Sequence, residues 1–502
     1  MLKPKTEPKW SSYMSESAEC KLRAALCHPV SSVDPQAMAA VTPIKPFSPE
    51  ETRWILEHLQ HPSVFLNMTQ GWPVLHWTAQ HLSGCLQDRL IRFRLGRKEA
   101  TNAPLFETQC SYIEATVTQF LRWTQHQTDV GSFSEYPCSE YWAYADYKYI
   151  TTLFHDQPSM FEDVKWSEFG FEGRNGKEST LWIGSEGANT PCHLDTYGCN
   201  LVLQVQGRKR WHLFPPEDTA KLYPTRIPYE ESSVFSQVHV LHPDLRKFPQ
   251  FQGARAHTVT LEPGQVLYVP RHWWHYVESI DPITVSVNSW IELEVDDAAR
   301  VSEAVTRTVV CAMKSALSDD NADTWLNPTE EEKLSHEENM QYLNLAVSAQ
   351  RKRGLFHRKP SPDPRATQPA KRDSCGRLKL RGDGVKVPAS VRLPFGQHLI
   401  PVKCQEDEPE ETVPEETVPE DSSCDAAVSP GEDGSAGAKG KHTCGADLTQ
   451  FSSCNLATER GNNQGSGPSL ITTNDLLDCL VHPDIISRVT ELLLERHGGG
   501  HL

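Results

Sequence analysis

A short stretch of the chain, residues 190–195 with the sequence TPCHLD, places an imidazole and a carboxylate two positions apart. Side chains at i and i+2 leave the same face of a β-strand, so His193 and Asp195 can reach one ion. A third ligand must come from elsewhere, and His272 and His275 are the candidates. Two histidines and one carboxylate on one face of an octahedral ion leave three positions open, the arrangement of non-haem Fe(II) oxygenases.

Segments of alternating hydrophobicity surround these residues. Period-two patterns occur at 201–205, 211–214, 265–269 and 284–288, and Gly and Pro residues separate them. No helical segment of comparable strength lies between them. The pattern therefore predicts an antiparallel sandwich or barrel, of which the jelly roll is one form.

Helices and a further strand are expected on both sides of this β region. They are a helix opening at Pro49, a strand at 91–95, a helix at 115–124, a helix at 295–316, and a helix that starts at a capping box of Thr329 and Glu332 and runs toward 350. The fold class expected from these patterns is mainly β with flanking helices.

The composition of the 502 residues limits the function classes. The formal net charge of −17 argues against a protein that coats nucleic acid or an anionic membrane, and no apolar run is long enough for a transmembrane helix. The N-terminus lacks the apolar core of a secretory signal, and the 14 cysteines include no C-x-x-C pair. We therefore expect reduced thiols and a cytoplasmic protein, with the nucleus as a second expected location.

The region from 354 to 472 is expected to be disordered. A basic block at 351–381 carries eleven Lys or Arg against two Asp, and an acidic run at 406–421 carries nine Asp or Glu and contains a tandem repeat of the sequence ETVPE. Polar residues dominate up to 472, a composition that cannot offset the entropy of ordering by burial. The basic block is read as a solvated linker, a nuclear import signal or an anchor for an acidic partner.

Apolar residues return at helical spacing in the last segment, 473–498, which predicts a terminal helix. A helix after a long linker needs a surface to pack against. It can dock back on the same chain, form a homodimer with a second copy, or bind another protein.

An ordered set of motifs resembles the JmjC (cupin-type) family of 2-oxoglutarate oxygenases over roughly residues 45–295. The set consists of WIGSEG at 182–187, TPCHLD at 190–195, GRKRWHLFPP at 207–216, PGQVLYVP at 263–270, WWH at 273–275 and VNSW at 287–290. It is similar to the motifs of the asparaginyl hydroxylase that inhibits hypoxia-inducible factor. The resemblance implies a double-stranded β-helix (a jelly roll) at 181–295. A flexible segment 1–44 and a helical and strand part 45–180 would precede it, and helices at 296–353 would follow.

The resemblance also implies the residues of an active site. His193, Asp195 and His275 would bind Fe(II), and Lys209 with Thr190 would bind the distal carboxylate of 2-oxoglutarate, because an ammonium and a hydroxyl can recognise one carboxylate. Further residues expected at the same pocket are Asn200, Asn288 and Tyr144. Two alternatives are open: Lys209 could be one of three surface bases at 208–210, and Tyr144 could be a core aromatic.

Hydroxylation of a protein side chain is the activity that the resemblance favours, and a nucleic-acid substrate is not expected. The resemblance extends to a branch of the family associated with small heat shock proteins, which implies such partners and a role in the stress response. The alternative is a non-enzymatic adaptor that keeps the JmjC fold and binds small heat shock proteins, because fold and function are separable.

Overall fold

The computed structural model describes residues 44–98, 102–127, 130–315, 325–330, 334–356, 392–405 and 471–497. Three predictions lie wholly or almost wholly outside these ranges: the flexible segment 1–44, of which only Ile44 is described, the acidic run, and the basic block beyond residue 356.

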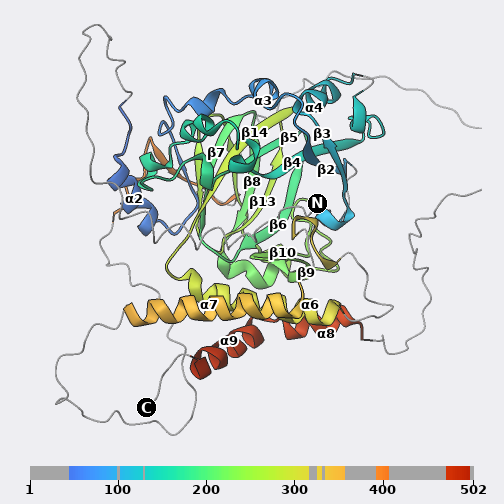
Figure 1. Ribbon diagram of the computed structural model, residues 1–502, viewed down its shortest axis with the longest axis vertical. Coiled ribbons are helices and arrows are strands. Elements are labelled where there is room, and N and C mark those ends of the chain that lie inside the picture. The colour runs from blue at the N-terminus through green and yellow to red at the C-terminus, as the bar shows by residue number, and fades with distance from the viewer. Residues whose placement is uncertain are drawn as a thin grey trace, which may run out of the picture. The chain divides into compact units, whose positions relative to one another are not determined.

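Two antiparallel sheets form the centre of the described chain (Figure 1). The larger sheet contains, in spatial order, β15 (Leu399–Pro401), β1 (Ser63–Phe65), β12 (Val266–Val269), β7 (Cys199–Gln206), β14 (Ile283–Ile291), β5 (Thr180–Ser185), β4 (Tyr141–Tyr149), β2 (Ile91–Arg97) and β3 (Ser111–Ala115). The smaller sheet contains β11 (His257–Leu261), β8 (Lys209–Phe214), β13 (Trp274–Ser279), β6 (Asn189–Asp195), β10 (Ser233–Ser236) and β9 (Pro224–Glu230).

Two runs of consecutive strands, β5 to β8 and β11 to β14, alternate between the two sheets. Strands β5 and β7 belong to the larger sheet and β6 and β8 to the smaller one, and β11 to β14 alternate in the same way. This winding is the double-stranded β-helix, so the predicted jelly roll is confirmed.

The space between the sheets holds one hydrophobic core and the outer face of the larger sheet holds another. Val202 of the larger sheet packs with Trp211 and Leu213 of the smaller sheet, whereas Leu201 and Leu203 point the opposite way. The period-two patterns of the sequence therefore belong to strands whose alternate residues pack into different cores, one on each face.

Helices of the N-terminal part cover the outer face of the larger sheet. They are α2 (Pro49–His58), α3 (Ala79–Leu86), α4 (Val117–Thr124) and the short α5 (Ile150–Leu153). Helix α2 begins at the predicted residue, because Ser48 accepts a hydrogen bond from the Glu51 amide while Glu51 accepts one from the Ser48 amide.

Short 3₁₀ helices join many of these elements. They lie at Pro73–His76, Glu107–Gln109, Gly131–Phe133, Pro158–Asp163, Trp166–Phe169, Gly176–Glu178, Pro216–Leu222, Pro249–Gly253 and Pro328–Glu330.

Four helices described after the jelly roll are α6 (Asp296–Lys314), α7 (His336–Phe356), α8 (Thr473–Leu480) and α9 (Pro483–His497). Helix α7 begins later than predicted. Its cap is Ser335, whose hydroxyl accepts from the Glu338 amide, so the pair with the capping-box spacing is Ser335 and Glu338. Glu332 of the predicted box lies outside the described residues.

The predicted terminal helix is two helices, because the chain breaks at Val481 and His482 and Pro483 starts a new helix. Leu477 and Val481 pack against α6 in one cluster, and Ile486 packs against α6 and α7 in another. Of the uses left open for this segment, the structure shows docking on the same chain (Figure 1). Among the helices described, none combines the length and apolar character that crossing a bilayer requires.

Residues 392–405 correct the prediction of disorder across 354–472. Strand β15 pairs antiparallel with β1, with Leu399 opposite Phe65. Leu399 is buried in the core under the N-terminal helices, and Val402 is buried in the core between the sheets. The prediction was wrong here because the apolar run is short and the residues around it are polar, so the average composition of the region is polar. The strand that it pairs with also lies more than 330 residues earlier.

Replacing Leu399 by alanine should lower the free energy of unfolding by about 2–5 kcal/mol, since Leu399 is fully buried in the main core. The matched control is Ile400→Ala in the same strand, whose side chain is 42% exposed, and it should change the stability by less than about 1 kcal/mol. Denaturant unfolding of the full chain measures both values. Equal losses in the two variants would contradict the contribution of Leu399 to the core.

Candidate functional site

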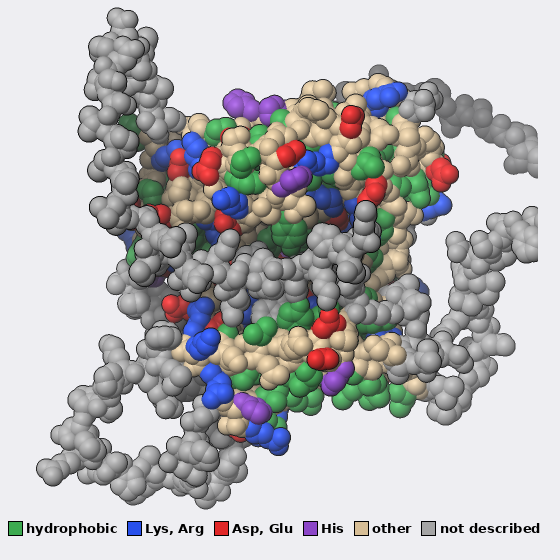
Figure 2. All heavy atoms as spheres, in the orientation of Figure 1, with side chains coloured by type: hydrophobic (Ala, Val, Ile, Leu, Met, Phe, Trp, Pro, Cys, Tyr) green, Lys and Arg blue, Asp and Glu red, His purple; other side chains and the backbone are tan. Residues whose placement is uncertain are grey.

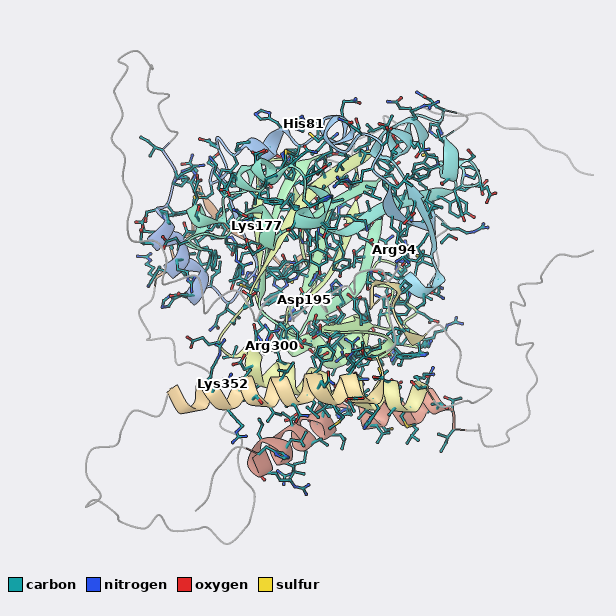
Figure 3. All side chains as sticks on the ribbon, in the orientation of Figure 1. His81, Arg94, Lys177, Asp195, Arg300 and Lys352 are labelled. Atoms are coloured by element: carbon teal, nitrogen blue, oxygen red, sulfur yellow. The ribbon has the colours of Figure 1, made fainter. Side chains whose placement is uncertain are left out.

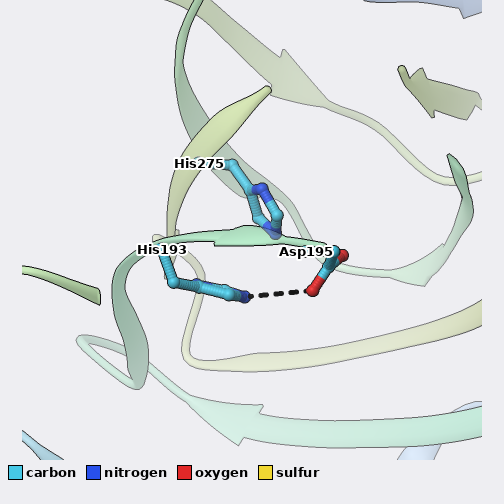
Figure 4. Close-up of side chains that lie close together, drawn as sticks. All are labelled: His193, Asp195 and His275. Carbon is cyan, nitrogen blue, oxygen red and sulfur yellow. Dashed lines mark ion pairs between the residues drawn. The ribbon is translucent and has the colours of Figure 1, made fainter. Parts of the chain in front are cut away.

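Three side chains of the smaller sheet meet between the sheets. His193 of β6 and His275 of β13 are directly paired residues, and their ring centroids lie 4.2 Å apart. Asp195 lies two residues along β6, with its Oδ1 atom 3.8 Å from His193 Nε2 (Figure 4). One ligand atom from each residue lies within 4.8 Å of the others, so the three surround a common point. His272 does not join them and lies in the turn before β13 with φ +66°.

Both imidazoles are fixed in one orientation and one tautomer. The Nδ1 atom of His193 donates to the Pro191 carbonyl at 2.9 Å, and that of His275 donates to the Trp273 carbonyl at 3.0 Å. In the neutral form of each ring the lone pair is then on Nε2, the atom available to a metal. Burial lowers the pKa of His275 to about 4, and the nearby His193 adds to this, so the His275 ring is neutral.

Thr190 reaches the same interior through an irregularity in β6. On a regular strand Thr190 and His193 would face opposite sides, because they are three residues apart. The register against β13 shifts here: His275 pairs with His193, but Val277 pairs with Thr190. The extra residue is a β-bulge, and it brings the Thr190 hydroxyl close to the Tyr144 hydroxyl.

Lys209 occupies a buried pocket beside this pair. Its side chain is almost inaccessible to solvent, and Nζ donates to Tyr144 Oη at 3.1 Å and to Ser286 Oγ at 2.8 Å. Within the described ranges no carboxylate forms an ion pair with it. Burial lowers the pKa of Lys209 to about 7, against a smaller opposite effect of Asp146. Lys209 is therefore not a surface base, unlike Arg208, whose side chain is 51% exposed.

Two buried amides face the space between Lys209 and the histidines. Ser286, Asn288 and Trp290 alternate along β14, which places Asn288 between one residue that contacts Lys209 and another that contacts Asp195. The Oδ1 atoms of Asn200 and Asn288 are buried and have no hydrogen-bond partner in the described part of the chain. Buried amides are normally satisfied, so these two fit a site that holds a polar ligand.

Several residues of the site were missed by the sequence analysis. Ser286 lies in the period-two pattern 284–288, Trp290 in the motif VNSW and Trp182 in the motif WIGSEG, but none of the three was assigned to the site. The Trp182 ring lies 6.0 Å from Lys209 Nζ. Arg94 was also missed and is labelled in Figure 3. It is fully buried, donates to Asp146 Oδ2 at 2.7 Å and to the carbonyl of Asn189 at 2.9 Å, and so supports the start of β6.

The aspartate lies at the open end of the site. Its side chain is 20% exposed, in contrast to the buried imidazoles. Two residues further on, the Tyr197 hydroxyl donates to Glu231 at 2.6 Å, and the guanidinium of Arg300 on α6 covers the Tyr197 ring at 4.7 Å. Asp195 and Arg300 are both labelled in Figure 3. Helix α6 therefore lies close to the partly exposed end of the three-residue cluster.

A jelly roll with two histidines and one aspartate on an inner face defines a cupin-like domain of the JmjC class. The family model described as "Cupin-like domain" matches residues 49–297. The chain is 56% identical over 457 residues to "HSPB1-associated protein 1 homolog" of Danio rerio, covering 90% of this chain and 98% of that protein. It is 49% identical over 472 residues to "HSPB1-associated protein 1" of Homo sapiens, covering 90% and 94%.

A more distant relative is "Lysine-specific demethylase 8" of Xenopus tropicalis, 28% identical over 238 residues, which cover 46% of this chain and 48% of that protein. The chain therefore belongs to the HSPB1-associated protein 1 family of cupin-like JmjC proteins. The family expected from the motifs is thus confirmed.

Proposed function

We propose that this protein is an Fe(II)- and 2-oxoglutarate-dependent oxygenase that hydroxylates a protein side chain. The observation that supports this most is Lys209, a buried cation that forms no ion pair with any described residue and lies in the same interior as the three metal ligands. A buried charge without a partner is costly unless a ligand supplies the opposite charge. A carboxylate ligand bound beside Lys209 would supply that opposite charge.

The residues fit the two cofactors in separate ways. His193, Asp195 and His275 would hold Fe(II), which when bound would activate dioxygen with oxidative decarboxylation of 2-oxoglutarate. Lys209 would neutralise the distal carboxylate, with Thr190 and Tyr144 as hydroxyl donors at the same pocket. Burial raises the pKa of the Tyr144 hydroxyl, so this group remains protonated and can donate.

The activity is tested on proteins that co-purify with the full chain. The wild type should add 16 mass units to a partner side chain when Fe(II) and 2-oxoglutarate are supplied, and Asp195→Ala should not. Succinate formation should follow the same pattern. A purified wild-type chain that binds neither Fe(II) nor 2-oxoglutarate would remove the oxygenase proposal and leave the adaptor alternative.

Association with HSPB1, a small heat shock protein, is proposed as a second function, because the relatives that match over most of this chain are named for it. Helices α8 and α9 offer a surface for such a contact. Their outer side exposes Leu476, Leu480, Ile485 and Val489, and Figure 2 shows apolar side chains gathered over this layer. Through this partner we propose a role in the stress response.

The double variant Leu480→Ser with Val489→Ser should weaken HSPB1 binding at least about tenfold if the outer side of α8 and α9 forms the contact. The Asp195→Ala variant should bind HSPB1 normally. Light scattering of the chain alone tests the other use of this surface, because a wild-type dimer that the double variant turns into a monomer would assign the surface to self-association.

A further inference from the structure

The carboxylate of Asp195 has a second partner besides the histidines. The indole Nε1–H of Trp290, on β14 of the opposite sheet, donates to Asp195 Oδ2 at 3.0 Å. The other oxygen, Oδ1, is the one that faces His193 Nε2. We infer that Trp290 is a positioning residue for the metal site: its N–H holds Asp195 in the orientation that presents Oδ1 to the metal. This inference rests on the proposed function.

Asp195 needs such a partner more than the two histidines do. Each imidazole is fixed by a carbonyl of its own strand and is buried, whereas Asp195 is at the end of β6 and is partly exposed. The terminal torsion of an aspartate is broad, so packing alone does not choose which oxygen faces the metal. Among the hydrogen bonds of the described chain, the bond from Trp290 is the only one that the Asp195 side chain accepts.

The indole itself is held in place by its aromatic neighbours. The Tyr147 ring lies parallel to it, with centroids 6.1 Å apart and an interplanar angle of 9°, and the Trp182 ring lies 6.4 Å away. Tyr147 is in a β-bulge, where the register between β4 and β5 shifts, and its φ is +51°. A left-handed backbone is costly for tyrosine, so the surrounding structure must favour the ring position that this conformation gives.

The hydrogen bond has a consequence for the number of open metal positions. The hydrogen bond from the indole N–H to Oδ2 favours metal binding through Oδ1 alone, and three ligand atoms then leave three positions for 2-oxoglutarate and dioxygen. Without the N–H, both oxygens are available, and a carboxylate that binds through both would fill one of these positions. Trp290 therefore acts on both the affinity for the metal and the geometry of its binding.

The experiment compares Co(II) binding to the full chain in two variants that each remove one indole N–H from a carboxylate. Trp290→Phe should raise the Co(II) dissociation constant by roughly 10- to 100-fold, the usual effect of losing a group that orients a ligand, and should change the visible absorption of bound Co(II). The control is Trp72→Phe, whose buried indole donates to Glu168 at 2.7 Å outside the three-ligand site. It should leave the dissociation constant within about twofold.

Each outcome decides between two hypotheses. Equal Co(II) affinity and spectrum in the wild type and Trp290→Phe would overturn the role of Trp290 but not the proposed metal site. A loss of Co(II) affinity in Trp72→Phe equal to that in Trp290→Phe would do the same. A wild-type chain that binds no Co(II) would instead overturn the metal site itself. If Trp290→Phe does not fold, Tyr147→Leu is the second variant. It keeps the indole N–H of Trp290 but removes the ring stacked on that indole, and it should weaken Co(II) binding several-fold. Unchanged binding there would also contradict the inference.

Discussion

Replacing Asp195 by alanine should remove Fe(II) from the protein without unfolding it. Asp195 is the anionic member of the three-ligand set, and two neutral imidazoles retain a divalent ion far less well. We expect the affinity for Fe(II) to fall by more than about 100-fold, since even losing a group that only orients a ligand costs about 10- to 100-fold. Iron content after anaerobic loading and dialysis measures the effect.

The fold should survive because the Asp195 side chain is partly exposed at a strand end and belongs to no hydrophobic cluster. Asp281→Ala is the matched control, since its carboxylate is similarly exposed and pairs with Arg208 outside the site. It should retain iron at the wild-type level. An Asp195→Ala protein with a full complement of iron would show that the metal, if bound, is held elsewhere.

The second large effect is expected at Lys209. Replacing it by methionine keeps the length of the side chain but removes the charge, and this should weaken 2-oxoglutarate binding by roughly 2–5 kcal/mol, or about 30- to 5,000-fold. The melting temperature of the chain without ligands should not fall, because the variant removes a buried cation that no described residue pairs with. Arg210→Met, on the outward side of the same strand, is the control and should bind normally.

Binding of 2-oxoglutarate should also depend on pH, and only when Lys209 is present. The pKa of Lys209 is about 7 in the empty pocket, and a bound carboxylate stabilises the charged form, so above pH 7 binding takes up a proton. The dissociation constant should therefore rise with pH above 7, by at most about tenfold per unit. Calorimetry in buffers of different ionisation enthalpy measures the proton uptake. Absence of proton uptake by the wild type at pH 8 would contradict this prediction.

The same pKa has an opposite effect on the stability of the empty protein. Between pH 7 and the ordinary lysine pKa near 10.5, the unfolded chain binds more protons at this residue than the folded one. The contribution of Lys209 to the free energy of unfolding therefore increases with pH in this window, by up to about 1.4 kcal/mol per unit. This increase in stability with pH should be absent from the Lys209→Met variant.

Regular strands made the central part of the site predictable. The spacing of His193 and Asp195, two residues apart, already indicates a shared face, and the structure places both with His275. Thr190 could not be placed by the same rule, because a β-bulge reverses its side. Arg94 was not predictable either, since it contacts the carbonyl of Asn189 across 95 residues of chain.

The C-terminal region shows a different limit of sequence reasoning. The helical periodicity of 473–498 predicted helical structure, but it did not predict the break before Pro483 or the face that packs on α6. Leu399 is ordered because its strand pairs with the edge strand β1 of the larger sheet. The average composition of 354–472 contains no information about such a distant pairing partner.

Strand β15 also determines how this protein can be divided for experiments. A fragment trimmed to the matched stretch 49–297 would lose β15 and leave the peptide groups of β1 unpaired along the rim of the larger sheet. Bare rims of this kind recruit strands from other molecules, and such a fragment would be prone to precipitate during preparation. Inclusion of residues 392–405, either by the natural connection or as an added peptide, would shield that rim.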